Sequence, residues 1–364
     1  MTRPASEDEL AQIVREARGP FVLRGGGTRT IVRPASGVVL ETGGLSGITL
    51  YEPGALTLVA RAGTPLREVE AALAAEGQRL PFEPPDLRGL LGRGGESTIG
   101  GVVAANASGP RRVQGGACRD SLIGVRFVDG TGTVIRNGGR VMKNVTGIDL
   151  VKLLAGSHGT LGVLTEVSFK LLPSPEVQAT LRIEGLSDRD AVAAMSAALG
   201  SPYDVTGAAH LPGQGTFLRL EGFETSVRYR QCELARVLRR FGDVADGDAG
   251  IWGQVRDVAP FHGLAGDVWM ISTLPSAAPD LVARAGAAAA IYDWGGGRVW
   301  LLMEPGTDLR QRVGGFQGHA TRIRGEGAVP AFHPEPAPVA ALTAGLRARF
   351  DPRGLFNPGL MRAA

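Results

Sequence analysis

Apolar and polar positions along the first half of the chain follow the periods of short helices and strands. Ser6 and Glu9 have the spacing of a capping box, and apolar side chains then recur over residues 10–17 at the spacing of one helix face. Residues 161–171 alternate instead between apolar and polar, which predicts a strand with one buried face. The pattern therefore predicts a mixed architecture of short helices and strands.

Three glycine-rich segments interrupt this pattern, and each lies beside a predicted strand. They cover residues 24–28, 97–120 and 156–162. The longest, residues 97–120, contains the apolar run GVVAA and little of the proline, acid and charge that are typical of surface loops. Backbone without bulky side chains can approach another molecule closely with its N–H groups uncovered. We interpret the longest segment as the wall of a ligand site.

Beyond the sequence PSP at residues 173–175, glycine turns become sparse and strand and helix patterns alternate. Residues 225–241 predict a long arginine-rich helix, an alanine-rich helix is expected around residues 283–290, and residues 339–350 predict an amphipathic helix. We expect an α+β fold in three parts: residues 1–172, a cap with an antiparallel sheet over residues 173–336, and a helix and tail over residues 337–364 that return to the first part.

Composition narrows the class of protein. The 364 residues are 43% hydrophobic and 21% charged, with a formal net charge of +3 and no basic run, which indicates a globular protein that does not bind nucleic acid. Cys118 and Cys232 are too few for a disulfide framework or for an iron–sulfur cluster, which needs about four cysteine ligands. No apolar run approaches the roughly 20 residues that span a bilayer. We expect a cytoplasmic protein that reaches a membrane only through partners.

The motifs exclude several kinds of site. No glycine turn is followed by Gly-Lys-Ser/Thr, so the chain has no P-loop, and no clean G-x-G-x-x-G follows a strand, so it has no Rossmann fingerprint. His210, His262, His319 and His333 are scattered through the second half and do not form a cluster in the sequence. A metal site in this chain is therefore not expected.

Four segments in a fixed order carry a family resemblance. RGGGT at residues 24–28, TIGG with NASG at residues 98–109, GSHGTLGVLTE at residues 156–166 and FDPRGLFNPG at residues 350–359 resemble the motifs of FAD-binding domains of the vanillyl-alcohol-oxidase, or PCMH, type. LPFEPP, GPRR, GGRVMKNVTGIDL (residues 138–150) and DWGG are further similar to segments of the FAD-binding subunits of bacterial glycolate oxidase. The resemblance implies a PCMH-type domain of two subdomains, followed by the α+β cap.

The resemblance also implies a cofactor and the residues that bind it. FAD is expected to be non-covalent, since the first turn contains no histidine. One departure from the family pattern is His158, which stands where the family usually has glutamate, at a point where the flavin is approached mainly by backbone. The implied binding residues are Arg24, Gly25, Gly26, Gly27, Thr28, Thr98, Ile99, Gly100, Gly101, Asn106, Ser108, Gly109, Gly116, Asp120, Gly159, Val163 and Asn357.

Oxidation of a 2-hydroxy acid at a flavin requires a group that holds the carboxylate and a base that takes the hydroxyl proton. Arginine suits the first task and histidine the second. His319 and Arg322 are our candidate catalytic pair. They lie three apart on a predicted strand and therefore point to opposite faces unless the strand is bulged, so ordinary polar positions on the cap sheet are the alternative.

The resemblance implies a subunit that works with a second flavin subunit and an iron–sulfur subunit. The family oxidises glycolate to glyoxylate and passes the electrons to an acceptor other than oxygen. Two alternatives stay open from the sequence. One is a self-sufficient flavin oxidase of another 2-hydroxy acid or alcohol. The other is a flavin-bearing electron relay or scaffold that performs no substrate chemistry.

Overall fold

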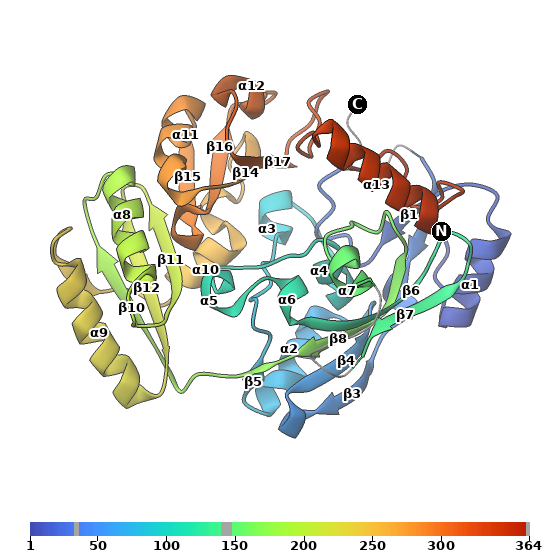
Figure 1. The fold of residues 1–364 in the computed structure, drawn as a ribbon, viewed down its shortest axis with the longest axis horizontal. Coiled ribbons are helices and arrows are strands. Elements are labelled where there is room, and N and C mark those ends of the chain that lie inside the picture. The colour runs from blue at the N-terminus through green and yellow to red at the C-terminus, as the bar shows by residue number, and fades with distance from the viewer. Residues whose placement is uncertain (33–35, 140–147, 362–364) are drawn as a thin grey trace.

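A computed structural model describes residues 1–32, 36–139 and 148–361 (Figure 1). Most of the GGRVMKNVTGIDL motif therefore lies outside the described residues. Two bodies lie side by side: an N-terminal region with its strands between Phe21 and Pro173, and a cap with its strands between Val177 and Arg324. None of the helices in the described part of the chain is long and apolar enough to cross a membrane.

The N-terminal region begins with α1 (Glu7–Glu16), where the Ser6 side chain accepts a hydrogen bond from the Glu9 N–H, as the capping box predicts. β1 (Phe21–Arg24) pairs in parallel with β2 (Val38–Glu41). A five-stranded antiparallel sheet follows, in the order β3-β4-β8-β6-β7. Its strands are β3 (Ile48–Glu52), β4 (Thr57–Arg61), β8 (Val163–Lys170), β6 (Leu122–Val128) and β7 (Val134–Gly138).

Helices and a small sheet cover this region. The helices are α2 (Leu66–Ala75), α3 (Arg88–Leu91), α4 (Ile99–Ala104), α5 (Arg112–Gly115), α6 (Cys118–Ser121) and α7 (Leu150–Leu154), and β5 (Gln78–Arg79) pairs with β9 (Leu172–Pro173). The segment that we interpreted as a wall is thus three short helices, α4 to α6. The apolar residues of α4 and α6 pack on the five-stranded sheet, where Phe82 and Phe169 have ring centroids 5.5 Å apart.

The cap is an eight-stranded sheet in the order β13-β10-β12-β11-β15-β16-β14-β17. Its strands are β10 (Val177–Ile183), β11 (Val205–Leu211), β12 (Gly215–Gly222), β13 (Val244–Asp246), β14 (Asp267–Thr273), β15 (Ala289–Asp293), β16 (Arg298–Met303) and β17 (Gly318–Arg324). All of its strand pairs are antiparallel, which confirms the predicted α+β architecture.

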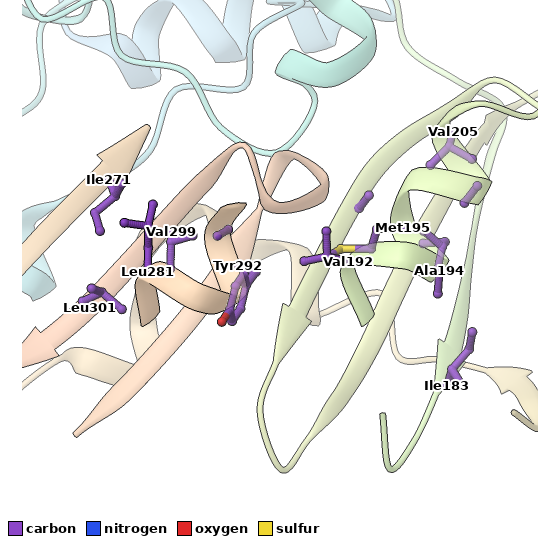
Figure 2. Packing of buried hydrophobic residues seen from close by; sticks show 14 of the residues in the cluster. Ile183, Val192, Ala194, Met195, Val205, Ile271, Leu281, Tyr292, Val299 and Leu301 are labelled. Carbon is purple, nitrogen blue, oxygen red and sulfur yellow. The ribbon is translucent and has the colours of Figure 1, made fainter. Parts of the chain in front are cut away.

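Helices pack on both faces of the cap sheet. The apolar residues of α8 (Asp188–Leu199), α9 (Glu224–Leu238), α11 (Ala278–Ala285) and α12 (Leu309–Val313) share one core with the sheet. Figure 2 shows part of this core, where side chains such as Met195 of α8 and Leu281 of α11 lie against the strands. A second core joins α10 (Ile251–Asp257) and α3 of the N-terminal region to the same sheet. The second core therefore fixes the cap against the N-terminal region.

Two element predictions are wrong. The alanine-rich stretch is not one helix, because α11 ends at Ala285, Gly286 takes a left-handed conformation, and Ala289 already begins β15. The last helix, α13 (Ala337–Phe350), exists but is not amphipathic, since none of its residues is buried and Leu342 is 71% exposed. The tail after it does return, as Phe356 forms a bridge with Phe21 of β1 and is buried there.

A buried ion network joins the cap to the N-terminal region. Arg219 of β12 donates to both carboxylate oxygens of Glu83 at 3.0 Å. Arg111 donates to Glu221 of β12 at 2.9 and 3.0 Å, and Arg79 donates to the same carboxylate at 2.7 Å. Although burial opposes ionisation, these arginines lower the pKa of Glu221 to about 2 and also lower that of Glu83. Cations and carboxylates thus neutralise each other across the boundary.

Candidate functional site

A cleft of about 1180 Å³ opens in the N-terminal region, where the three glycine-rich segments converge. Its lining also includes residues of β2, of the turn after β4, of the loop before α4 and of the C-terminal tail. Of the sequence-predicted binding residues, the structure brings eleven together in this lining: Arg24, Gly25, Gly26, Gly27, Thr28, Thr98, Gly100, Gly101, Gly159, Val163 and Asn357.

The turn after β1 forms one wall of the cleft. A side chain at Gly26 would overlap the carbonyl oxygen of Glu96, and one at Gly25 would overlap the Thr98 hydroxyl. Gly27 has φ +71°, which L side chains rarely adopt. The turn therefore depends on glycine both for its conformation and for its close packing. Arg24, at the end of β1, forms an ion pair with Glu41 of β2.

α4 forms the second wall. Thr98 caps its N-terminus and accepts a hydrogen bond from the Gly101 N–H at 3.2 Å. A Cβ at Gly100 would lie 2.6 Å from the carbonyl oxygen of Ala62, so this glycine lets α4 pack on the turn after β4. A Cβ at Gly101 would meet only the Thr98 hydroxyl, at 3.1 Å. Gly101 therefore leaves open space that belongs to the cleft rather than to the protein core.

The third wall is tied to the C-terminal tail. The Asn357 side chain accepts a hydrogen bond from the Leu23 N–H and donates one to the His158 carbonyl oxygen, both at 2.8 Å. His158 has φ +50°, and its own N–H donates to Ala104 of α4 at 2.9 Å. Both hydrogen-bonding groups of the Asn357 amide are thus used to join β1 to the third glycine turn.

His158 contributes its ring as well as its backbone. Burial lowers the pKa of its imidazole to about 4, so it is neutral at physiological pH. Its ring meets Phe332 edge-on, with centroids 5.1 Å apart. The side chain therefore packs as a neutral aromatic group at the cleft.

Sequence reasoning missed Arg29, which directly follows the first glycine turn and lines the cleft. Its guanidinium donates to Ser97 Oγ and, at 2.5 Å, to the carbonyl oxygen of Pro85, while its Nε is buried with no hydrogen-bond partner in the described structure. Burial lowers its pKa to about 10. The loop Arg93–Glu96 was also missed, although its glycine pair just before Thr98 is the same kind of signal as the other turns.

Six predicted binding residues lie outside the lining. Ile99 is part of the core, and Gly116 ends α5 with φ +77°. Gly109 packs closely against Glu83, since a Cβ at Gly109 would overlap the Glu83 carbonyl oxygen.

The other three predicted residues hold α6 in place. The Asn106 side chain accepts from the Arg119 N–H, Ser108 Oγ accepts from the Cys118 N–H, and the Asp120 carboxylate accepts from the Ala117 N–H. A cofactor-binding role for these six stays a prediction.

The structure does not bring the candidate catalytic pair together. Arg322 is buried, and its guanidinium donates to the carbonyl oxygens of Glu326 and Val329, both at 2.8 Å. Arg322 lies opposite Trp269 of β14, a residue of the cap core, in the β14–β17 pairing. His319, near the start of β17, is exposed. The fork of Arg322 is therefore occupied by the chain itself. Partial desolvation of its ring and the nearby charge of Arg112 lower the pKa of His319, which keeps the ring neutral.

A cluster of arginines and tryptophan lies where η5 (Trp294–Gly296) of the cap meets α5. The guanidinium carbon of Arg298 lies 3.9 Å from the Trp294 ring centroid and that of Arg112 lies 4.4 Å from it. Arg298 forms an ion pair with Asp293, which is fully buried, and donates to the carbonyl oxygen of Ser108 at 2.6 Å. Among the described residues, no group of three or more His, Cys, Asp or Glu side chains is arranged to hold a metal ion.

Residues 1–138 match a family model described as an FAD binding domain. The chain is 39% identical over 350 residues to glycolate oxidase subunit GlcE of Escherichia coli K12, covering 94% of this chain and 93% of that protein. It is 34% identical over 184 residues to glycolate oxidase subunit GlcD of Bacillus subtilis, covering 49% of this chain and 38% of that protein.

Solved structures extend the likeness of fold to nearly the whole chain. Alkyldihydroxyacetonephosphate synthase matches with a TM-score of 0.72 at 16% sequence identity, covering 99% of this chain and 76% of that one. A second crystal form of the same enzyme gives a TM-score of 0.71. At this identity the match shows a common architecture of FAD-binding region and cap, and nothing about substrate.

Proposed function

Because the chain belongs to the family of glycolate oxidase subunit GlcE and is an FAD-dependent oxidoreductase, we propose that it is the flavin subunit of a complex that oxidises glycolate to glyoxylate. The observation that carries the proposal is the 39% identity that spans 94% of this chain and 93% of the Escherichia coli subunit. Both the cleft region and the cap are thus included in the likeness.

The cleft fits the cofactor. Its volume of about 1180 Å³ exceeds the ordinary range for small-molecule pockets, as a dinucleotide requires. We assign FAD binding to the three walls of the cleft, at Arg24–Thr28, Thr98–Gly101 and Ser157–Gly159. Glycine backbone at these places can approach pyrophosphate, and the free Nε of Arg29 offers one further donor.

FAD, when bound, supplies the acceptor for a hydride from the carbon that carries the substrate hydroxyl. The chain must then provide a base for the hydroxyl proton. We assign this task to a ring nitrogen of His319, since partial desolvation and Arg112 lower its pKa and so keep its imidazole neutral and able to accept a proton. Asp293 does not suit the task, because its carboxylate is engaged by Arg298 and the Trp294 N–H.

Two partners complete the proposal: a second flavin subunit and an iron–sulfur subunit. The chain has only two cysteines, of which Cys118 is buried and Cys232 exposed. An iron–sulfur cluster needs about four cysteine ligands, so a second protein must carry it. Electrons from the flavin would pass to that subunit, and any contact with a membrane would be made there.

The test is to add glycolate anaerobically to the purified chain and to the complex assembled with its partners, and to follow flavin absorbance at about 450 nm. We expect bleaching in the complex and formation of glyoxylate. Bleaching of the isolated chain by another hydroxy acid, with none by glycolate in the complex, would support a self-sufficient oxidase instead. A complex that turns over normally with a flavin-free variant of this chain would refute the catalytic role.

The variant Gly101→Val tests the cleft. A branched side chain there meets almost no protein atoms but enters the space that we assign to FAD, so the variant should fold and lose at least about 90% of its flavin. Gly345→Val on the exposed α13 is the matched control, since nothing lies within 4 Å of its Cβ position. Equal flavin contents in the two variants, measured against protein concentration, would contradict the assignment.

A further inference from the structure

Arg112 is a half-buried cation that lacks an anion. Its guanidinium lies 4.4 Å from the Trp294 ring centroid, and it forms no hydrogen bond or ion pair with any residue in the described ranges. Burial lowers its pKa, the nearby charges of Arg298 and Arg119 lower it further, and the charge of Asp120 offsets only part of this. Burying a charge among like charges costs free energy, which a bound anion would offset.

The carboxylates near Arg112 are already engaged. Asp293 forms an ion pair with Arg298 and accepts from the Trp294 N–H at 2.7 Å. Asp120 caps α6 through the Ala117 N–H and lies 3.8 Å from Arg119. Residues 33–35, 140–147 and 362–364 contain no Asp or Glu in the sequence. The anion that Arg112 lacks must therefore come from outside this set of side chains.

Trp294 holds the Arg112 guanidinium against its ring while its own backbone has an unfavourable conformation. Its φ is +54°, which is unfavourable for a bulky side chain, and its Nε1 donates to the carbonyl oxygen of Gly109 at 3.0 Å. The next residue, Gly295, is packed so closely that a Cβ would lie 2.5 Å from Leu199. Strain that packing enforces in this way is typical of functional sites. The stacked guanidinium keeps its N–H edge free for a planar partner.

We propose that Arg112 binds the carboxylate of the small organic acid that the enzyme oxidises. The inference rests on the proposed function and replaces Arg322, whose fork is occupied, as the carboxylate ligand. A carboxylate matches the two parallel donors of a guanidinium. Arg112 is not part of the lining of the FAD cleft, so the pyrophosphate is not its partner. Arg112 is near His319, so one acid could meet both the cation and the proposed base.

The experiment is a calorimetric titration of the flavin-loaded chain with oxalate, an unreactive carboxylate, and with glycolamide as the uncharged control. Arg112→Met should weaken oxalate binding at least tenfold, and Arg112→Lys should restore part of it. Arg119→Met is the matched control, because Arg119 is an exposed neighbour whose ion-pair partner is Asp120, and it should bind oxalate as the wild type does. Glycolamide should bind equally weakly to all four proteins.

Unchanged oxalate affinity in Arg112→Met overturns the inference, as does a wild type that binds glycolamide and oxalate alike. Loss of partner-subunit binding in Arg112→Met with oxalate affinity retained also overturns it, because the anion would then belong to the partner. In the complex, Arg112→Met should raise KM for glycolate at least tenfold. A wild-type complex that glycolate does not reduce would refute the proposed function, while the titration would still decide the role of Arg112.

Discussion

Arg111 and Arg112 are consecutive in the chain and lie in opposite electrostatic environments. Arg111 is buried and donates to Glu221 at 2.9 and 3.0 Å, with Glu83 3.7 Å away. Arg112 is half-buried against Trp294 and faces Arg298 and Arg119 without a carboxylate of its own. The pKa of Arg111 is raised, although burial opposes this, because Glu221 and Glu83 favour its charge, whereas that of Arg112 is lowered.

The difference distinguishes Arg111, whose charge stabilises the fold, from Arg112, whose charge we propose binds a ligand. A buried cation with its carboxylates in place fixes two parts of the molecule together, and its removal leaves uncompensated charge behind. A cation with no internal anion contributes little to folding and remains available to a ligand. Substitution of Arg111 should therefore destabilise the fold, whereas substitution of Arg112 should change its stability little.

The largest effect is expected for Arg219→Leu. The change leaves the buried Glu83 carboxylate with the Arg111 backbone N–H at 3.0 Å and the Arg111 guanidinium 3.7 Å away. It also removes the stack of the Arg219 guanidinium on Trp252. The free energy of unfolding should fall by about 4 kcal/mol, as measured by urea denaturation. Arg228→Leu on the exposed face of α9 is the control and should cost less than about 0.5 kcal/mol. Similar costs for the two variants would mean that the network is not structural.

Arg111→Met should come next, with a loss of about 3 kcal/mol. The loss is smaller because Arg79 still donates to Glu221 at 2.7 Å and Arg219 still neutralises Glu83. Thermal unfolding followed by circular dichroism gives the comparison with wild type. A loss of unfolding free energy near zero for Arg111→Met would contradict the proposed difference between Arg111 and Arg112.

Acid should weaken the network in a defined range of pH. The pKa of Glu221 is about 2 in the folded protein and 4.5 without the fold, so its contribution is complete above pH 4.5 and is lost as the pH falls toward 2. This carboxylate should make the free energy of unfolding about 2 kcal/mol lower at pH 3 than at pH 6. The variant Glu221→Gln should lack this contribution to the pH dependence of the free energy of unfolding. Parallel pH profiles for wild type and variant, from urea titrations, would rule the assignment out.

The smallest effect on folding is expected for Arg112→Met. The substitution removes a stack on Trp294 but also removes repulsion with Arg298, so the free energy of unfolding should change by less than about 1 kcal/mol in either direction. The same urea titration as for Arg219→Leu measures it. A loss as large as that of Arg111→Met would mean that Arg112 has a structural anion after all.

Local signals in the sequence predicted much of the fold. Ser6 caps α1, the alternating residues 161–171 contain β8, and the tail returns at Phe356, since capping, periodicity and apolar content are written within a few residues. Ala289 was misjudged because a run of alanines suits a helix, while sheet pairing with Leu302 decides its conformation.

The candidate site was predictable where it depends on backbone. The glycine turns that line the cleft can be recognised in the sequence, because a side chain at several of these positions would overlap neighbouring atoms or require an unfavourable φ. The contrast between Arg111 and Arg112 was not predictable, since Glu221, which distinguishes them, is 110 residues away from Arg111. Likewise, the spacing of His319 and Arg322 does not reveal that carbonyl groups of the following loop occupy Arg322.

The position of Asn357 near the end of the chain determines when during synthesis the cleft can be completed. It joins β1 to the third glycine turn through groups 334 and 199 residues earlier in the chain. While the ribosome is still making the cap, the first and third turns have no tail to hold them together. If FAD binds in the cleft as we propose, we expect it to bind only after the cap strands and α13 have been synthesised.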